Sequence, residues 1–254
     1  GHEFRSTGLL AGIERDLGDR LAAGGSLGYV KSSTDFDNQR GELETNSFRL
    51  GSHATYFRDE LEVDLAVSGG MHLHRQERRM TVPESSVAVS RYKSYDGSAY
   101  ACTRYRQKLP DELALVPSAS VHYTYHHREG FTEDGAGDAR LGFPSQSEQS
   151  LRSNLEMSLG REISGHSFVL LPNVFAGWSR DFLNEEIEMD ARLAGAPGSQ
   201  FSVVGEGPGQ SVTRYGLGVT ALFWDYNVAF VRYEREKLEQ GGARTLSLGM
   251  KWNF

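Results

Sequence analysis

The chain has little cysteine and no long apolar run. Cys102 is the single cysteine among 254 residues, which excludes an intrachain disulfide and a cysteine-rich metal site. The longest apolar patches, such as Phe168 to Leu171, fall far short of the ~18–20 residues that a membrane-spanning helix needs. If this chain crosses a membrane, it therefore does so with β-strands.

Positive charge is also scarce. The formal net charge is −7, the isoelectric point is near 5.7, and no basic stripe runs along the sequence. Nucleic acid is therefore not expected as a partner. The first residues, Gly1 to Phe4, lack the apolar core of a secretion signal. We interpret these four residues as a cloning scar and expect the export signal upstream, in a longer precursor.

The sequence does contain regular alternation between apolar and polar residues. In the last segment Leu246, Leu248, Met250, Trp252 and Phe254 are apolar, whereas the residues between them are small or polar. A period of two places the two sets on opposite faces of a β-strand. Similar segments recur at 48–56, 61–71, 113–125, 155–159 and 215–223, and we count about eleven in all, with no helical stretch.

The connections between these segments alternate in length. Short links are centred on Gly18-Asp19, Arg58-Asp59, Pro110-Asp111, Ser164-Gly165 and Trp224-Asp225, and longer polar links span 33–42, 76–96, 127–149, 184–210 and 238–242. An outer-membrane barrel has tight periplasmic turns and long outer loops, whereas a β-sandwich has no reason to alternate in this way. Aromatic residues near segment ends, such as Tyr123 and Tyr125, are typical of interfacial girdles. The sequence therefore predicts an all-β fold, an antiparallel transmembrane β-barrel.

Several stretches resemble the C-terminal translocator domain of autotransporters, the proteins of type V secretion. The ending Gly249 to Phe254 resembles the terminal strand of outer-membrane barrels, which implies that Leu248, Met250, Trp252 and Phe254 form a signal for the assembly machinery. Further similar stretches are 12–15, 24–29, 172–182, 191–205 and 232–235. The resemblance covers nearly the whole chain and implies one translocator domain over residues 1–254.

The resemblance also implies twelve strands and a helix that plugs the pore, one strand more than the alternating segments supply. Because Phe254 should end in the periplasm, counting back makes Thr7 to Asp16 a descending strand, which needs an ascending partner. We expect the first strand and the plug helix to lie outside this sequence. The alternative is an extra strand within Val87 to Lys93, and a paired strand there would argue against a missing one.

Charged residues of both signs fall on the polar side of the predicted strands. They are Arg49, Glu62, Asp64, Arg152, Glu156, Arg214, Arg232, Glu234 and Lys251. Ionised groups are tolerated where water or an opposite charge lies close to them. We expect these residues to line a hydrated lumen through which an extended passenger or a plug helix can slide, although any wide barrel would have such an interior.

Motifs for chemistry are weak. Gly24 to Gly28 matches the nucleophile-elbow pattern, but it lies inside an alternating strand rather than at a strand-to-helix turn. His72 and His74 share a strand face without a third ligand at a defined spacing. Glu133 to Asp138 lacks the full ligand series of a calcium loop, so we expect an acidic, flexible outer loop there. We predict no catalytic residue, no cofactor and no metal site.

Together these patterns predict an outer-membrane barrel that anchors an N-terminal passenger domain and helps to move it to the cell surface, and that is not an enzyme. The expected partners are its own passenger, the barrel-assembly machinery with periplasmic chaperones, and outer-membrane lipid including lipopolysaccharide, with the barrel itself a monomer. Three alternatives stay open: a porin-type channel, a membrane anchor for a surface adhesin or enzyme, and a soluble all-β binding protein.

Overall fold

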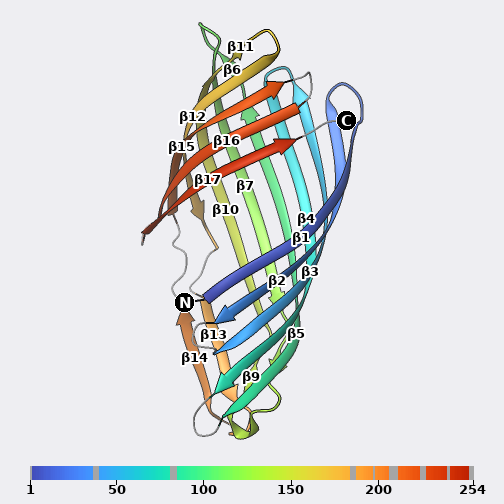
Figure 1. The fold of residues 1–254 in the computed structure, drawn as a ribbon, viewed down its shortest axis with the longest axis vertical. Coiled ribbons are helices and arrows are strands. Elements are labelled where there is room, and N and C mark those ends of the chain that lie inside the picture. The colour runs from blue at the N-terminus through green and yellow to red at the C-terminus, as the bar shows by residue number, and fades with distance from the viewer. Residues whose placement is uncertain are drawn as a thin grey trace.

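The computed structural model describes residues 2–36, 40–80, 85–183, 187–196, 198–205, 211–223, 227–238 and 241–251. Its main element is a strongly curved antiparallel sheet in which eleven long strands follow one another in chain order (Figure 1). These strands are β1 (His2–Asp16), β2 (Leu21–Phe36), β3 (Gly41–Arg58), β4 (Leu61–Met80), β5 (Ser86–Tyr105), β7 (Leu113–Arg128), β10 (Gln146–Arg161), β12 (Phe168–Asp181), β15 (Ser211–Phe223), β16 (Asn227–Leu238) and β17 (Gly241–Lys251).

The two ends of this sheet differ. At one end the links are tight, and Gly18 and Asp59 take the left-handed backbone conformation, with φ of 107° and 53°. Two short strands lie there, β6 (Gln107–Lys108) on β7 and β11 (Ile163–Ser164) on β12. The opposite end carries a second, four-stranded sheet of β8 (Phe131–Thr132), β9 (Leu141–Phe143), β13 (Ile187–Leu193) and β14 (Gln200–Gly205), with the 3-10 turn η2 (Gly137–Ala139) (Figure 1).

The predicted long links at this end are partly wrong, because the strands extend further than the alternation indicated. Most of the range 76–96 is strand: β4 runs to Met80, β5 starts at Ser86, and these two residues are paired. The range 127–149 contains β8, β9 and the start of β10, and 184–210 contains β13 and β14. Beyond the lipid-facing belt both faces of a strand are polar, so the alternation disappears while the backbone ladder continues.

The stretch Val87 to Lys93 is paired, as the alternative required, but it adds no strand. It pairs with residues Leu73 to Arg79 of β4 and forms the outer part of the single twenty-residue strand β5. The count of long strands therefore stays at eleven, as predicted.

Parity limits how such a sheet can close. Each of the eleven strands is antiparallel to the next, so β1 and β17 at the two edges run in the same direction. The pairings among the described residues leave the sheet open between these two strands. One further strand of opposite direction would make an even-numbered antiparallel barrel.

The sheet has its large apolar side chains on the outside rather than in a core. Leu50 is 64% exposed and Leu248 is 71% exposed, and many other leucine, valine and aromatic side chains are similarly open. The buried apolar residues of the described chain are few, and except for Phe175 they are small. No helix within the described residues is both long and apolar enough to span a membrane.

Candidate functional site

The strand register places all nine charged residues predicted for the lumen on one face of the sheet, which we call the polar face. Arg49 lies opposite Gly70, Gly70 opposite Asp96, and Asp96 opposite His126. The same parity continues through the remaining strands. The other face, which we call the apolar face, carries Leu50, Leu248 and the other exposed apolar side chains of these strands.

The polar face is concave, because side chains on strands that are not neighbours meet across it. Arg49 on β3 contacts Asp96 on β5 at 2.7 Å, across β4. Adjacent strands lie about 4.8 Å apart, so such contacts require inward curvature and room above the intervening strand. Gly70 supplies that room, since a Cβ at this position would lie 2.5 Å from the Asp96 carboxylate.

One group of polar residues surrounds Asp96. Its carboxylate accepts hydrogen bonds from Arg49 and lies 2.5 Å from His72 Nε2, while His72 Nδ1 lies 2.8 Å from the Ser47 hydroxyl. Both His72 and Asp96 have side chains only 14% exposed. The guanidinium thus compensates the charge of a carboxylate that has little water around it, and the imidazole contacts the same carboxylate.

A second group lies nearer the tight-link end, on β3, β4 and β5. Arg104 donates to both Glu62 and Asp64, and the Thr55 hydroxyl donates to Asp64 at 2.7 Å. One guanidinium therefore compensates two carboxylates that are neighbours on the same strand face.

A third group joins β10, β15 and β16. Arg214 lies 3.3 Å from Glu156 across β12, and Arg232 lies 3.8 Å from Glu156 and 3.0 Å from Glu234. The Arg232 guanidinium also stacks over the buried ring of Phe175, 3.7 Å from its centroid. Cation–π contact and ion pairing together hold this side chain flat against the wall.

The two remaining predicted residues differ in their surroundings. Arg152 lies 3.7 Å from the buried carboxylate of Asp181, which also accepts a hydrogen bond from the Ser150 hydroxyl at 2.5 Å. Lys251 has its Cα opposite Val228 at the end of the described part of β17, on the polar face.

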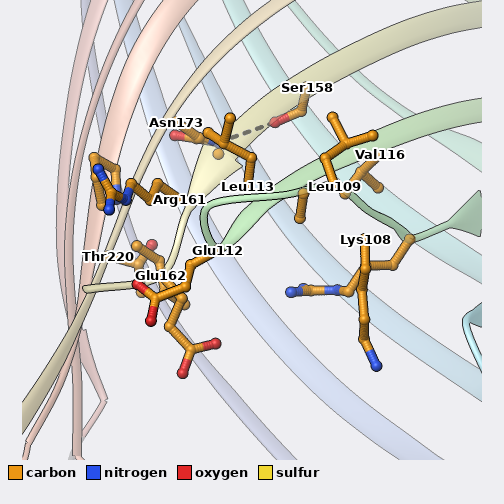
Figure 2. Close-up of a pocket in the computed structure, with 15 residues that line it drawn as sticks. Lys108, Leu109, Glu112, Leu113, Val116, Ser158, Arg161, Glu162, Asn173 and Thr220 are labelled. Atoms are coloured by element: carbon orange, nitrogen blue, oxygen red, sulfur yellow. Dashed lines mark hydrogen bonds between the residues drawn. The ribbon is translucent and has the colours of Figure 1, made fainter. Parts of the chain in front are cut away.

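A cavity of about 500 Å³ opens on the polar side near the tight links. Charged side chains at this end of the sheet, including Lys108, Glu112, Arg161 and Glu162, surround it, and Asn173 donates a hydrogen bond to Ser158 (Figure 2). Its lining combines charges of both signs and small polar groups with apolar side chains such as Leu113 and Val116.

At the opposite end the link between β7 and β10 is fastened to the sheet. Arg78 donates to Glu133 through Nε at 2.9 Å and through an Nη at 2.5 Å, and the Leu141 N–H donates to the same carboxylate. Hydrogen bonding to Glu133 raises the pKa of Arg78. Asp134 and Val89 exchange two backbone hydrogen bonds. Glu133 is therefore buried and fixed, and the prediction of a flexible acidic loop is wrong for this residue.

Aromatic rings continue this attachment. His74 stacks on Tyr92 at 4.6 Å, Tyr92 on Phe131 at 4.1 Å, and Phe131 on Phe143 at 4.8 Å. Arg128 lies over both phenylalanine rings. The link between β7 and β10 thus folds over the polar face rather than away from it.

Sequence reasoning missed several partners of the predicted charges. Asp96 ends a range that the sequence predicts as a link, and the alternation does not single out Arg104 or Asp181. The two charged residues predicted for the polar face of β4, Glu62 and Asp64, are both carboxylates. This excess of negative charge indicates that a neighbouring strand supplies a cation, which is Arg104 in the structure. Of the predicted assembly signal, Leu248 and Met250 lie exposed on the apolar face, whereas Trp252 and Phe254 lie outside the described residues.

These features define a class. A single antiparallel sheet that is apolar outside, charged and ion-paired inside, and built with tight links at one end and long ones at the other is an outer-membrane β-barrel wall. Comparison with known proteins supplies the family: the model of the autotransporter beta-domain matches residues 1–234. The chain belongs to this family, and it is an outer-membrane translocator barrel.

Solved structures support the fold. The translocator domain of autotransporter NalP from Neisseria meningitidis is 18% identical with a TM-score of 0.69, and the match covers 100% of this chain and 81% of that one. The beta domain of the Bordetella autotransporter Brka is 18% identical with a TM-score of 0.65, over 98% of this chain and 88% of that one. The transport unit of AIDA-I from Escherichia coli is 12% identical with a TM-score of 0.56, over 100% of this chain and 84% of that one.

One sequence relative is a much longer protein than this chain. Outer membrane protein A of Rickettsia rickettsii is 25% identical over 239 residues, which is 87% of this chain and 10% of the relative. The chain thus spans about a tenth of the length of that curated relative.

Proposed function

We propose that residues 1–254 form one translocator domain and that its polar face lines the path of an upstream passenger segment across the outer membrane. The observation that carries the proposal is the pairing of charges on this face. The carboxylates of Asp64, Asp96 and Glu156 each have a cation within contact distance. An extended chain sliding past this part of the wall therefore meets charges that neighbouring side chains already compensate, and such charges hold it only weakly.

The orientation follows from the links. Tight turns face the periplasm in barrels of this class, so the 500 Å³ cavity beside Lys108 and Glu162 marks the periplasmic mouth. The four-stranded sheet and the link anchored by Arg78 and Glu133 then lie at the cell surface. The domain works without an energy source of its own, as the passenger's folding outside would bias the direction of movement.

Closure of the barrel is part of the proposal. Because β1 and β17 run in the same direction, a strand antiparallel to both would complete a twelve-stranded barrel between them. We assign that strand, and a helix within the lumen, to the segment that joins the passenger to β1.

The proposed partners follow from the same picture. They are the passenger, periplasmic chaperones, the barrel-assembly machinery, and the lipids of the outer membrane, with the barrel monomeric. We propose that Leu248, Met250, Trp252 and Phe254 form the signal that the assembly machinery reads.

We propose no catalysis on the polar face. The contacts Ser47–His72–Asp96 have the composition of a hydrolase triad. However, Arg49 engages the same carboxylate, and the backbone N–H groups of β3 and β4 are committed to the ladders on either side. An oxyanion would find no pair of free backbone donors at this point.

The experiment uses the full-length protein with an epitope in its upstream region, expressed in cells that are then treated with protease. Ser68 and Ser98 lie opposite one another on the polar face, and Val67 and Ala99 form the neighbouring pair on the apolar face. Replacing Ser68 and Ser98 by Trp narrows the lumen, whereas replacing Val67 and Ala99 by Trp adds the same bulk on the lipid side. We expect the first variant to leave most of the epitope protected and the second to expose it as the wild type does.

Heat-modifiable gel mobility of the barrel serves as the folding control for both variants. Equal surface exposure of the epitope in both folded variants would refute the lumen assignment. A protected epitope in the wild type beside a correctly folded barrel would instead favour the porin-type alternative.

A further inference from the structure

Three cations gather on the apolar face at the outer end of β16 and β17. Arg235 and Lys237 are neighbours on this face of β16, and Arg244 of β17 lies directly opposite Arg235. All three side chains are exposed. Like charges directly opposite one another destabilise a sheet, so this placement costs stability unless an anion lies between them.

The cations have no carboxylate partner within the described part of the chain. The described outward positions of β15, β16 and β17 include no acidic residue, because Glu234 and Glu236 point to the polar face. Some other exposed cations on the apolar face are ion-paired: Arg5 with Glu3 at 2.6 Å, Lys31 with Glu44 at 3.5 Å, and Arg75 with Glu77 at 2.9 Å. Arg79, Arg91 and Lys93 are also exposed on this face without an ion pair among the described residues, but none of the depressions whose lining residues the structure describes lies between them.

The surface is hollowed between the three cations. A depression of about 340 Å³ is lined by Tyr215, Arg235, Lys237, Gly242 and Arg244, and also by Glu236, which belongs to the polar face of β16. Gly242 lies opposite Lys237 and presents no side chain, which leaves space at the centre of the cluster.

The position of the depression relative to the membrane is set by its neighbours. Tyr215 lies opposite Arg235, and Tyr233 precedes Arg235 by two residues on the same face. Further along the strands, away from the link between β16 and β17, the apolar face carries exposed apolar side chains that include Leu217, Val231 and Leu246. Tyrosines mark the interface of the hydrocarbon layer, so the cations lie at the level of the lipid headgroups.

We propose that Arg235, Lys237 and Arg244 form a binding site for the phosphorylated sugar headgroup of lipopolysaccharide in the outer leaflet. The assignment of this end to the outer leaflet rests on the orientation given in the proposed function. A zwitterionic phospholipid carries no net charge to match three cations, whereas a glycolipid with several phosphates does. Phosphate oxygens accept paired hydrogen bonds from the planar guanidinium groups, and the tyrosine ring packs beside the sugar.

The test is a binding measurement on the purified full-length protein in detergent, in which bound lipid is counted by native mass spectrometry. The probes are lipopolysaccharide, the same lipopolysaccharide with its phosphates removed, and inorganic pyrophosphate. The variant carries Arg235→Ala, Lys237→Ala and Arg244→Ala. Its control carries Arg5→Ala, Lys31→Ala and Arg75→Ala, which removes the same charge from ion-paired positions on the same face.

A cation near an anionic lipid surface contributes roughly a fivefold gain in affinity, so we expect the site variant to bind lipopolysaccharide about a hundredfold more weakly than the wild type. The control variant and the wild type should bind alike, and the phosphate-free lipid should bind all three proteins weakly. Heat-modifiable mobility shows that each barrel is folded.

Equal affinity of the site and control variants, or equal binding of the phosphate-free lipid, would overturn the proposal. Tight binding of pyrophosphate without binding of lipopolysaccharide would also overturn it, since the depression would then be an anion site unrelated to the membrane. The measurement does not depend on passenger export, so a failure of this proposal and a failure of the translocation path are distinguished.

Discussion

Arg78 and Glu133 form one ion pair, but we expect Arg78→Ala to weaken the attachment of the link between β7 and β10 more than Glu133→Ala does. The Glu133 side chain is 4% exposed, whereas Arg78 is 29% exposed. Arg78→Ala leaves a buried carboxylate with the Leu141 N–H as its one remaining donor among the residues that the structure describes. Glu133→Ala leaves a guanidinium that water can reach and that keeps its hydrogen bond to the Ala139 carbonyl.

The difference can be put into numbers. Removing one partner of a buried ion pair costs about 3–5 kcal/mol when the other charge stays buried and unpaired. Loss of hydrogen bonds without a stranded charge costs about 1–2 kcal/mol, which we expect for Glu133→Ala. These costs fall on the attachment of the link between β7 and β10, because the ladder of β4 and β5 does not depend on the pair.

Hydrogen exchange of the folded protein in detergent measures this attachment. The Asp134 N–H, bonded to Val89 O at 2.8 Å, and the Glu133 N–H, bonded to Leu141 O at 2.9 Å, report opening of the link. We expect exchange to accelerate about a hundredfold or more in Arg78→Ala and roughly tenfold in Glu133→Ala, at about 1.4 kcal/mol per factor of ten. Arg79→Ala, on the opposite face, is the matched control. A larger effect of Glu133→Ala, or effects no greater than the control's, would refute the reasoning.

Three further predictions test the faces and the end of the sheet. In a Cys102→Ser background, a membrane-impermeant thiol reagent should label Ser68→Cys from the aqueous lumen and leave Val67→Cys on the lipid side unlabelled in proteoliposomes; the opposite labelling would reverse the faces. Leu155→Arg, on the apolar face, should lower the free energy of unfolding by about 2–4 kcal/mol, measured by denaturant titration in lipid, whereas Asn154→Arg on the polar face should cost clearly less. Deleting Phe254, or replacing it with Asp, should reduce the yield of heat-modifiable barrel in the outer membrane without lowering synthesis, and a normal yield would count against the assembly signal.

The sequence predicted the membrane-facing half of each strand better than the outer half. Leu61, Val63, Leu65 and Val67 alternate with polar or small residues because lipid lies on one side and water on the other. Beyond this belt, as at Arg75 to Arg79, both sides face water and the requirement for alternation ends. The strand continues there because the backbone ladder to β5 continues, and this ladder is a tertiary feature that one strand's composition does not record.

For the candidate site, the face of each charge was predictable and its partner was not. Arg49 could be placed on the polar face from the alternation in β3 alone. Its contact with Asp96 depends on the register of two successive pairings, β3 with β4 and β4 with β5. A shift of one residue in either pairing would move Asp96 to the other face. The glycolipid site has the same character, because Arg244 comes near Arg235 only through the register of the last hairpin.

Glycines on the concave polar face make room for the ion pairs that line the proposed translocation path. Where a charged side chain must cross a neighbouring strand, that strand has a glycine: Gly70 lies under the Arg49–Asp96 contact, and Gly216 lies beside the Phe175 ring that supports Arg232, with a Cβ there only 2.6 Å from the ring. A larger residue at either position would push the two side chains apart and leave unpaired charges facing the lumen. An unpaired carboxylate or guanidinium in the wall would bind oppositely charged segments of a moving chain. The glycines thus keep the wall neutral over short distances, which is the property that a path for passengers of varied sequence requires.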